Sequence, residues 1–402
     1  MDIPAVSDSS WTESVRPKFH GSARAMFPVV LKGLFLTIIT LGIYRFWYMT
    51  NVRRFLWNNT EVDGDFLEYT GRGVELFIGF LIAVAVLVPF YAMLFLAPLY
   101  MGAEAAAVAQ GLYGFALLLL AQYALYRARR YRLTRTIWRG VRFQQSGSGW
   151  GYAWRSLLWL ILTVLTLGLA YPWMRAGLER YKMTNTWYGD QQGAFSATGG
   201  QLFWRTLLVW LAALVVIGGP IAFVAGMEAT GNIGAASPAH ALILVSVIGF
   251  IVLVPVYWAV EFRWWANGCS VGPAAAACDL GNFAFFKVYL GYLGVALLFG
   301  LVVGAIGLGI GFALHSGGVL EGMAAQARPP VVFFVAFGAF YFLVGLVFAA
   351  LWQVFGVRPI WRKSFESCEI RGLGALMAAQ SVTPEANAFG EGIADAIDFG
   401  GF

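Results

Sequence analysis

The sequence contains few charged residues. They make up 12% of its 402 residues, whereas soluble domains average about 25%. Hydrophobic residues account for 59% and aromatic residues for 16%, which excludes a disordered chain because such chains are poor in aromatic side chains and rich in charge. A soluble core could not bury so many apolar side chains without leaving large exposed patches. This composition predicts an integral membrane protein.

The sequence is also poor in residues that perform catalysis or bind metals. Its histidines are His20, His240 and His315, and its cysteines are Cys269, Cys278 and Cys368. The histidines lack the spacing of a metal site, and the cysteines form neither a Cys-x-x-Cys pair nor a disulfide framework. No histidine or lysine is placed as the base of a nucleophilic site. We therefore expect no catalytic residue, metal ion or cofactor, and we predict that the protein is not an enzyme.

Long apolar runs account for most of the hydrophobic residues. A helix needs about 20 apolar residues to cross about 30 Å of hydrocarbon. Six runs without charge meet this length, at residues 76–103, 105–126, 206–227, 241–260, 288–314 and 331–357. Two shorter runs are ambiguous. Residues 33–44 are only 12 long, and residues 156–174 contain Gly168 and Pro172.

The positions of the basic residues distinguish between six and eight spans. Three stretches each hold two long apolar runs; they lie between Arg72 and Arg127, between Arg205 and Arg263, and between Lys287 and Arg358. The one basic residue within these three stretches is Arg328. Each stretch therefore predicts a helical hairpin with its tip outside the cell. If all the other bases are cytoplasmic, residues 33–44 and 156–174 must enter and leave the membrane on the same side. We predict an all-α polytopic membrane protein with six full transmembrane helices, two re-entrant segments and cytoplasmic termini. Eight transmembrane helices remain the alternative.

The chain contains an internal repeat. Residues 37–47 are TIITLGIYRFW and residues 163–173 are TVLTLGLAYPW, and the similarity continues without a gap for about forty positions. The two segments share the following residues: Thr37, Thr40, Gly42 and Trp47 in the first, and Thr163, Thr166, Gly168 and Trp173 in the second.

A shorter motif follows the membrane segments five times. In each copy an Arg is followed six residues later by Thr or Cys, and then by a Gly that favours a turn. The copies are Arg54, Thr60 and Gly64; Arg130, Thr136 and Gly140; Arg180, Thr186 and Gly189; Arg263, Cys269 and Gly272; and Arg362, Cys368 and Gly372. Asp63-Gly64 between alternating residues is a signal for a two-residue hairpin. We predict that each copy forms a short β-hairpin on the cytoplasmic face.

These strings resemble a known family. TLGIYRFW, followed by RRFLWNNTEVDGDFLEYTGRGVELF, is similar to the hallmark of the YjgN-like bacterial inner-membrane proteins, which are defined by a domain of unknown function. The resemblance covers roughly residues 15–372. Phe46 replaces the usual Pro of the family, which Pro172 retains in the second copy. The resemblance implies a location in the bacterial inner membrane, and it implies no reaction, ligand or catalytic residue.

We divide the chain into five parts on this basis. They are a disordered N-terminus (1–15), a first membrane repeat (16–142), a second membrane repeat (143–272), a C-terminal helical hairpin unit (273–372) and an acidic tail (373–402). The polar N-terminus has no base and therefore does not look like a cleavable signal peptide. We predict that the acidic tail either docks a protein partner or folds back onto the basic cytoplasmic face.

The basic residues predict contact with lipids. Residues 127–142 hold seven arginines with aromatic residues between them. Nucleic-acid binding would use such a patch, but directly after a span we expect contact with anionic headgroups instead. We therefore predict membrane lipids as partners and no nucleic acid. The acidic residues of 61–68 could pair with this basic run on the same face.

Two functions remain open at this point. Broken membrane segments in a repeated scaffold are typical of transporter sites, so we predict a permease or channel-like transporter in which Thr37–Trp47 and Thr163–Trp173 line the path. The alternative is a non-transporting membrane scaffold or lipid-organising protein, which the lack of charge within the six long runs favours. A polar cavity between the two segments would favour transport, and a packed apolar interior would favour the scaffold.

The six-span topology predicts where residues 50–70 lie. A single cysteine introduced there, in a variant without the natural cysteines, should be labelled only after the cell membrane is made permeable. Labelling by an impermeant maleimide in intact spheroplasts would contradict the six-span topology and favour eight spans.

Overall fold

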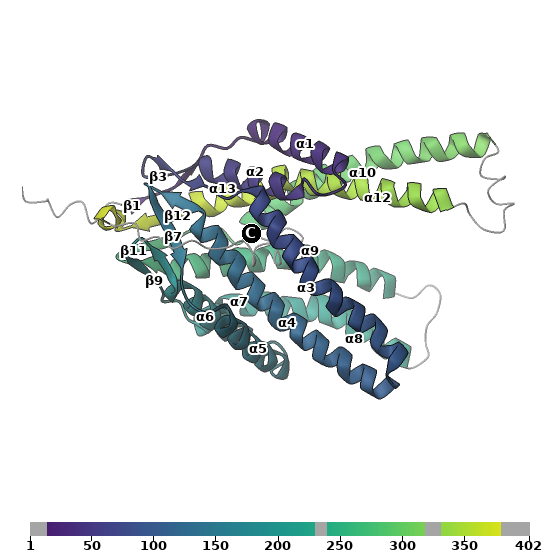
Figure 1. Cartoon of the computed structure of the whole chain (residues 1–402), viewed down its shortest axis with the longest axis horizontal. Coiled ribbons are helices and arrows are strands. Elements are labelled where there is room, and N and C mark those ends of the chain that lie inside the picture. The colour runs from purple at the N-terminus through teal and green to yellow at the C-terminus, as the bar shows by residue number, and fades with distance from the viewer. Residues whose placement is uncertain (1–13, 230–238, 318–330, 379–402) are drawn as a thin grey trace, which may run out of the picture.

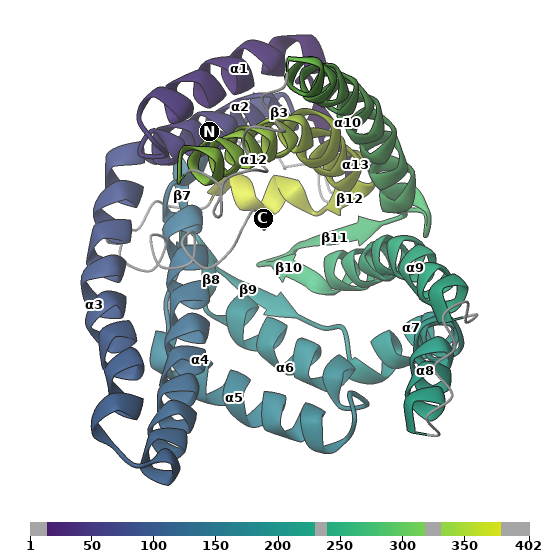
Figure 2. The ribbon, with the colours of Figure 1, turned by 90° about the vertical axis from the view of Figure 1, so that its right-hand side faces the viewer.

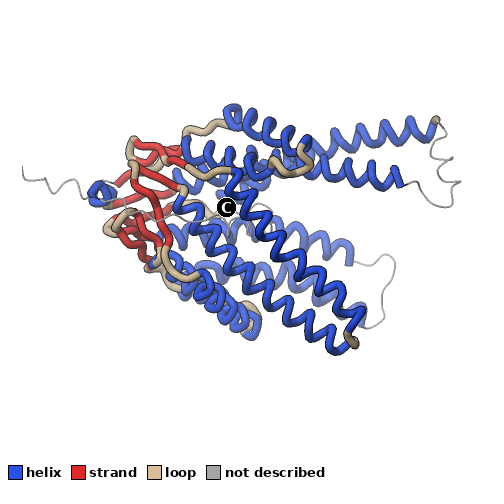
Figure 3. Tube along the Cα trace, viewed as in Figure 1, coloured by secondary structure: helices blue, strands red, loops and turns tan. Residues whose placement is uncertain are grey.

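Helices and strands occupy opposite ends of the molecule. A computed structural model describes residues 14–229, 239–317 and 331–378. Short strands gather at one end, and paired helices extend from them in the other direction (Figures 1 and 3). Residues 1–13 of the predicted disordered N-terminus and residues 379–402 of the acidic tail lie outside the described residues.

The helices form hairpins of two lengths. The short hairpins are α1 (Ala23–Ile39) with α2 (Arg45–Asn58), and α5 (Gly149–Leu165) with α6 (Tyr171–Thr184). The long hairpins comprise α3 (Gly73–Tyr100) with α4 (Ala103–Thr134); α7 (Gly199–Ala213), η2 (Leu214–Gly218) and α8 (Gly219–Ala229) with α9 (Ala239–Gly268); and α10 (Ala284–Ser316) with α12 (Val331–Trp352), η3 (Gln353–Val357) and α13 (Arg358–Glu366).

Six helical segments are long and apolar enough to cross a membrane, by length and composition. They are the two arms of each long hairpin, in agreement with the predicted number. The helices of the short hairpins are 17 and 14 residues long in both cases, so each arm reaches only about 21–26 Å at 1.5 Å per residue. The long arms α3, α4 and α10 have 28, 32 and 33 residues.

Each helical hairpin begins and ends in a short strand. The strands are β1 (Ser14–Val15), β2 (Lys18–Phe19), β3 (Thr60–Val62), β4 (Asp65–Phe66), β5 (Glu68–Tyr69), β6 (Thr136–Trp138), β7 (Val141–Gln145), β8 (Thr186–Tyr188), β9 (Gln191–Phe195), β10 (Cys269–Val271), β11 (Ala274–Cys278) and β12 (Cys368–Arg371). All the pairs are antiparallel. Nine strands form one sheet in the order β1-β12-β11-β10-β9-β8-β7-β6-β5, and β2-β3-β4 form a second sheet.

The two sheets join at both ends and close a ring. Only Leu67 separates β4 from β5, and only Arg16 and Pro17 separate β1 from β2. Each of these two extended segments therefore belongs to both sheets. Because one sheet begins and ends where the other does, the described strands follow one another around a closed ring. Figure 2 shows the helical hairpins arranged around this ring.

The Thr or Cys of the five motifs occupies the same place in each hairpin. It begins the closing strand and pairs with the last residue of the opening strand. The pairs are Phe19–Thr60, Tyr69–Thr136, Gln145–Thr186, Phe195–Cys269 and Cys278–Cys368. A backbone hydrogen bond repeats directly beside each pair, from His20 to Asn59, Thr70 to Arg135, Ser146 to Asn185, Ser196 to Gly268 and Asp279 to Ser367.

Tight turns connect the closing strand of one hairpin to the opening strand of the next. Asp63 and Gly64 have φ angles of 52° and 79°, and Arg139 and Gly140 have 49° and 73°. Two successive positive φ angles define the type I′ turn that suits a two-residue hairpin. The predicted hairpins at these turns are therefore present.

The fifth predicted hairpin does not form as expected. β12 pairs with β1, so Ser14 and Val15 take the place of a following strand. Ser14 and Val15 were assigned to the disordered N-terminus, and this assignment was wrong because the pairing depends on residues far away in the sequence. Likewise, the chain after Gly372 is not all tail: Leu373–Ala378 forms a 3₁₀ helix, η4.

The interior of the strand ring is apolar. The side chain two residues after each motif Thr or Cys enters one hydrophobic cluster, to which Val62, Trp138, Tyr188, Val271 and Ile370 all contribute. Leu373 and Leu376 of η4 complete the same cluster. Since side chains two apart lie on the same face of a strand, the motif Thr or Cys of each closing strand lies on the same face as the residue that enters this cluster.

This core predicts a stability effect for Trp138. Its side chain is 4% exposed, and Trp138→Ala should lower the free energy of unfolding by about 3–5 kcal/mol through the cavity that it leaves. Chemical denaturation in mixed micelles measures the effect. Trp204, which is 72% exposed, is the matched control, and Trp204→Ala should change stability much less. Equal effects would contradict the packed core.

Candidate functional site

The two Thr-Leu-Gly segments form the same turn at the tip of each short hairpin. Thr40 donates from Oγ1 to the Leu36 carbonyl at 2.7 Å and accepts from the Tyr44 amide at 2.9 Å. Gly42, with φ of 95°, donates its amide to the Thr37 carbonyl. The candidate residues therefore hold the turn together through local hydrogen bonds.

The second turn repeats these contacts. Thr166 donates from Oγ1 to the Leu162 carbonyl at 2.8 Å and accepts from the Ala170 amide at 3.0 Å. Gly168, with φ of 92°, donates its amide to the Thr163 carbonyl. Both turns raise an apolar side chain outward, because Leu41 is 88% exposed and Leu167 is 92% exposed.

Trp47 and Trp173 pack against the long helix that follows each short hairpin. Trp47 contacts Phe77 with ring centroids 5.7 Å apart, and Trp173 contacts Phe203 at 5.6 Å. The start of the next helix approaches so closely that a Cβ on Gly73 would lie 2.7 Å from the Trp47 Cα. These two tryptophans join neighbouring hairpins.

The structure does not bring the two turns together. α1–α2 and α5–α6 lie on opposite sides of the ring (Figure 2). At the strand ring, Trp138, Tyr188 and their neighbours from the other closing strands form one apolar cluster. The path lined by Thr37–Trp47 and Thr163–Trp173 stays a prediction.

The motif arginines do not all play one role. Arg54 donates to the Gly71 carbonyl at 3.2 Å and Arg263 to the Leu280 carbonyl at 3.1 Å, in each case at the start of the next hairpin. In the last hairpin Arg358 makes the equivalent contact, to the Gly21 carbonyl at 3.2 Å. Arg362 pairs instead with Glu366 at 2.9 Å.

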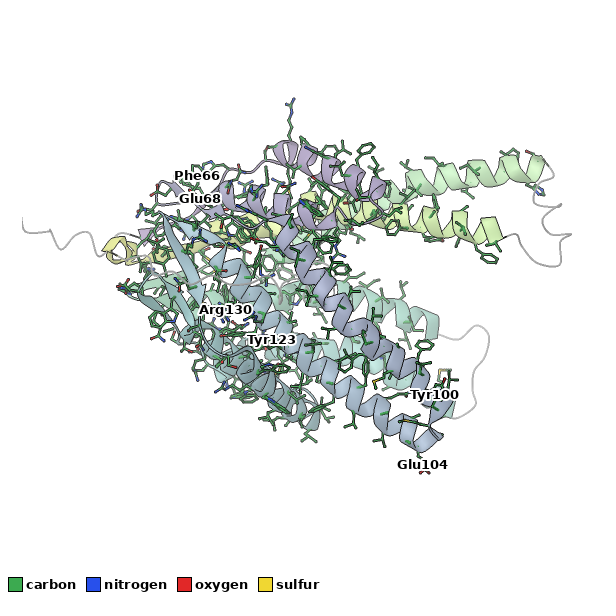
Figure 4. All side chains as sticks on the ribbon, viewed as in Figure 1. Phe66, Glu68, Tyr100, Glu104, Tyr123 and Arg130 are labelled. Carbon is green, nitrogen blue, oxygen red and sulfur yellow. The ribbon has the colours of Figure 1, made fainter. Side chains whose placement is uncertain are left out.

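Among the described residues, Arg130 and Arg180 make neither of these contacts. Arg180 is exposed and Arg130 is partly exposed. Figure 4 places Arg130 on the strand side of α4, far from Tyr100 and Glu104 at the tip of that hairpin.

The motif threonines accept hydrogen bonds from the preceding hairpins. Trp361 donates to Thr60 at 2.9 Å, Trp57 to Thr136 at 3.0 Å and Arg129 to Thr186 at 3.1 Å. At the other two positions the residue is Cys. The motif residue is therefore Thr at the three positions where a side chain of the preceding hairpin donates a hydrogen bond to its hydroxyl.

A buried ion cluster, which was not predicted from the sequence, lies between three hairpins. We use this name for Arg129 of α4, Arg175, Glu179 and Lys182 of α6, and Glu261 of α9. Glu179 is 3% exposed and Glu261 is also buried. Charged groups are almost never buried unless they are paired, so this cluster is the strongest candidate for a functional site.

The contacts within the ion cluster are short. Arg175 Nε lies 2.5 Å from Glu261 Oε1, and another Arg175 nitrogen lies 3.6 Å from Glu179 Oε1. Lys182 pairs with the same Glu179 oxygen. Trp265 donates to the second oxygen, Glu179 Oε2, at 3.1 Å. Each oxygen of the Glu179 carboxylate is therefore bound.

Arg129 connects the ion cluster to the strand ring. Its guanidinium donates to Gln145 Oε1 at 3.1 Å, to Thr186 Oγ1 at 3.1 Å and to the Lys182 carbonyl at 3.3 Å. Gln145 and Thr186 are a cross-strand pair. The charges of the cluster thus hold the short hairpin α5–α6 to its neighbours and to the ring.

Neighbouring cations keep Glu179 ionised. Burial on its own would raise the pKa of this carboxyl group, but Lys182 and Arg175 outweigh burial and hold the pKa of Glu179 below its ordinary value. A carboxylate that is charged and fully paired is suited to fixing helices in place. It would act in proton transfer only if its cationic partners moved away.

One signal in the sequence could have pointed to the cluster. Glu179 precedes the motif residue Thr186 by seven positions. Arg129 precedes Thr136, and Trp361 precedes Cys368, by the same number. An acid at a position used for contact between hairpins is unusual. It was missed because buried charge was sought only within the six long runs.

The predicted pairing between residues 61–68 and the basic run is present at Arg139. Arg139 contacts Asp65 at 2.5 Å and Asp63 at 2.9 Å. Arg135 pairs with Glu75 at 2.9 Å. The Arg139 pairs join the turns that follow the first and second hairpins, whereas the Arg135–Glu75 pair joins the two arms of the second hairpin.

The described residues contain no group of three or more His, Cys, Asp and Glu side chains that could hold a metal ion. His20 lies 2.6 Å from Glu61 across β2 and β3. His315 is exposed at the far end of α10. The side chain of His240 lies outside the described residues.

The apolar hairpins define a helical membrane protein. The comparison with known families is specific: the family described as "Bacterial protein of unknown function (DUF898)" matches residues 14–280. The chain belongs to this family, as the resemblance indicated.

Curated relatives carry the name Inner membrane protein YjgN. The chain is 28% identical over 153 residues to the protein of Escherichia coli (strain K12), a match that covers 38% of this chain and 36% of the relative. Identity to the protein of Salmonella typhimurium (strain LT2) is 39% over 70 residues, or 17% and 18% of the two chains. The matched part therefore spans about a third or less of the length of these relatives. No solved structure matches the chain.

The ion cluster predicts the effect of Glu179→Gln. The variant keeps the volume of the side chain but leaves Lys182 without its buried countercharge and Arg175 with Glu261 alone, so the free energy of unfolding should fall by about 3–5 kcal/mol at neutral pH. Because the pKa of Glu179 is lowered in the folded protein, its contribution is present at neutral pH and is lost as the pH falls through that lowered pKa.

The control for this prediction is Glu68→Gln, at an exposed position. It should change stability by no more than about 0.5 kcal/mol. If denaturation in mixed micelles gives the same result for both variants, Glu179 does not stabilise the fold as described.

Proposed function

We propose that this chain is a non-transporting scaffold or lipid-organising protein of the bacterial inner membrane, built from five copies of one unit with the strand ring in the cytoplasm. The observation that carries the proposal is the ring of strands, in which every closing strand contributes a side chain to one apolar cluster. A ring whose strands share such a cluster suits the holding of helices at fixed positions better than the passage of a solute. The relatives named as inner membrane proteins support the location.

The equivalent pairings support five copies of one unit. Each unit is an opening strand, a helical hairpin and a closing strand, and the motif Thr or Cys begins the closing strand every time. Short units occupy the first and third places, and long units occupy the second, fourth and fifth. On this view the units with short hairpins are the re-entrant segments of the predicted topology.

The basic residues support a cytoplasmic ring. On the long helices they stay within ten residues of the strands, as with Arg127 before Thr136, Arg205 after Phe195 and Arg358 before Cys368. Ten residues of helix rise about 15 Å. Positive charge is enriched on the cytoplasmic side, so this zone belongs at the cytoplasmic headgroups. Figure 4 shows Tyr100 and Glu104 at the opposite end of a long hairpin.

Exposed basic and aromatic side chains near the strand end of the helices suit binding of anionic lipids. Exposed bases alternate with exposed aromatic side chains on the outer helices, as in Trp154 with Arg155 and Trp204 with Arg205. Aromatic rings favour the level of the headgroups, and each base near an anionic surface contributes about 1 kcal/mol of attraction. Anionic lipids are therefore the partners that we propose.

The short hairpins support a wedge in one leaflet. Ile39, Leu41 and Ile43 are exposed around the first tip, and Leu165, Leu167 and Leu169 around the second. Arg45 follows Leu41 by only four residues, so the tip can enter the hydrocarbon only to a shallow depth. Segments of this kind bury their apolar face about 5–10 Å into the boundary between headgroups and acyl chains. Two wedges on opposite sides of a ring would spread the lipids of that leaflet.

Transport remains the second candidate, and the ion cluster is the observation that favours it. Glu179, Lys182 and Arg175 lie on α6, an arm of a proposed re-entrant hairpin. Buried ionisable groups beside a membrane are functional candidates by default. If the partners of Glu179 exchanged during a cycle, the cluster could couple movement of the hairpin to an ion.

The wedge proposal predicts a depth for residue 41. A spin label on Leu41→Cys, in a variant without natural cysteines in liposomes with anionic lipid, should show a depth of about 5–10 Å below the phosphates. The label should be more accessible to oxygen than to a polar nickel chelate. Tyr100→Cys, at the far tip of a long hairpin, is the matched control and should report the opposite headgroup level.

Flux measurements separate the two functions. Under the scaffold proposal, the same liposomes should show no more proton, potassium or small-solute flux than liposomes without protein, while spin-labelled phosphatidylglycerol is slowed. A label at residue 41 that reports the bilayer midplane would contradict the wedge. Solute flux that Glu179→Gln abolishes, in protein that still folds, would replace the scaffold by the transporter.

A further inference from the structure

Two cysteines face one another across the strands of the fifth hairpin. Cys278 ends β11 and Cys368 begins β12, and they are direct partners in the antiparallel register. Residues opposite one another in such a pair have Cβ atoms about 4.5–5.5 Å apart, close to the separation that a disulfide requires. Both cysteines are free thiols.

The surroundings hold the two thiols in place. Cys278 donates its backbone amide to Asn267 Oδ1 at 2.7 Å, and the next residue, Asp279, donates to the Ser367 carbonyl at 3.0 Å. The Ser367 hydroxyl lies 3.4 Å from Cys278 Sγ. Cys278 is buried, whereas Cys368 is partly exposed, so a small oxidant can approach along the Cys368 side.

These contacts make Cys278 the more nucleophilic of the two thiols. Hydrogen bonds from Cys368 and Ser367 stabilise the thiolate and lower the pKa of Cys278 to about 6. The pKa of Cys368 is raised, because its proton is shared with Cys278 and because it is buried. The thiolate is the reactive form of cysteine, so one member of the pair is ready to attack while the other stays protonated.

We propose that Cys278 and Cys368 form a peroxide-reactive dithiol that closes reversibly to a disulfide. The Cys278 thiolate attacks one oxygen of hydrogen peroxide, the O–O bond breaks and the second oxygen leaves as hydroxide, which gives a sulfenic acid on Cys278. The hydroxide takes the proton of Cys368 and becomes water. The Cys368 sulfur then attacks Cys278 Sγ, the S–S bond forms and the S–O bond breaks.

The atoms and electrons of this sequence balance. The departing oxygen of the sulfenic acid carries its hydrogen, takes one proton from the solvent and leaves as a second water, which restores the proton that Cys278 lost when it formed the thiolate. Two thiols are oxidised to one disulfide, and one hydrogen peroxide is reduced to two waters. A dithiol reductant reverses the change by thiol–disulfide exchange.

The disulfide would tie the last hairpin at its base. The bond closes a loop that holds α10, α12 and α13, and β12 is also the strand that β1 covers. Oxidation would therefore fix the fifth hairpin to the ring beside the point where the ring closes. This inference does not depend on whether the protein organises lipids or transports a solute.

Cys269 provides an internal control. It holds the place of Cys368 in the fourth hairpin, but its direct partner is Phe195 rather than a second cysteine. Burial raises the pKa of Cys269 to about 12, so this thiol lacks both a partner for a disulfide and a ready thiolate.

The test uses the purified full-length protein in nanodiscs with hydrogen peroxide as the oxidant. After denaturation, polyethylene-glycol maleimide should label three thiols before oxidation and one thiol afterwards, and dithiothreitol should restore all three. Peptide mass analysis should find Cys278 joined to Cys368 with the loss of two hydrogens. The oxidised protein should also melt at a higher temperature than the reduced protein, because the crosslink restricts the unfolded chain.

Three variants make the outcome decisive. Cys269→Ser should leave the oxidation intact, with two labels before it and none after. Cys368→Ser should accumulate a sulfenic acid on Cys278 that dimedone traps, and Cys278→Ser should slow the loss of thiols by about tenfold or more. Three labels after oxidation, reaction of Cys269 as fast as that of Cys278, or a disulfide between two chains would overturn the proposal.

Discussion

The structure depends on the closure of its strand ring. Each opening strand divides its pairing between two neighbours: Val141 and Arg142 pair with β6, and Phe143–Gln145 pair with β8. Because this pattern runs around the ring, the described strands are linked one to the next without a break. A closed ring also fixes both ends of every helical hairpin, so the position of each membrane helix follows from the sheet.

Contacts between neighbouring hairpins repeat around the ring but differ in chemistry. Arg54 and Arg263 donate to a carbonyl at the start of the next hairpin. The motif threonines accept hydrogen bonds from different donors: two from tryptophan side chains and one from an arginine. The donors are Trp361 to Thr60, Trp57 to Thr136 and Arg129 to Thr186. The backbone pairing is the constant part, and it allows side chains at equivalent positions to change. The ion cluster and the facing cysteines each occur where one unit departs from the others.

Much of the fold could be predicted because its signals are local. The absence of bases between Arg72 and Arg127 and between Arg205 and Arg263 indicated long hairpins, and Asp63-Gly64 indicated a turn from two adjacent residues. The turns at Gly42 and Gly168 were visible as a repeated string. The origin of these signals is short-range: backbone angles, helix length and the cost of charge in lipid.

The parts that could not be predicted depend on distant residues. Nothing near Ser14 or Val15 indicates a strand, because its partner is β12. Glu179 looks like an ordinary surface acid on a polar helix until Glu261 and Arg129 are placed beside it. Cys278 and Cys368 are 90 residues apart in the sequence, and only the register of β11 and β12 makes them a pair.

The pairing of β1 with β12 has a consequence for biosynthesis. Ser14 can pair with Arg371 only after Arg371 has been synthesised. Translation at about 5–20 residues per second takes roughly 20–70 s to produce the residues between them. Until then the growing sheet has two open edges, one at each end of the nascent chain. The ring can therefore close only after the last helical hairpin has left the ribosome, and any factor that holds or shields the first strand during that interval would determine how many chains assemble correctly.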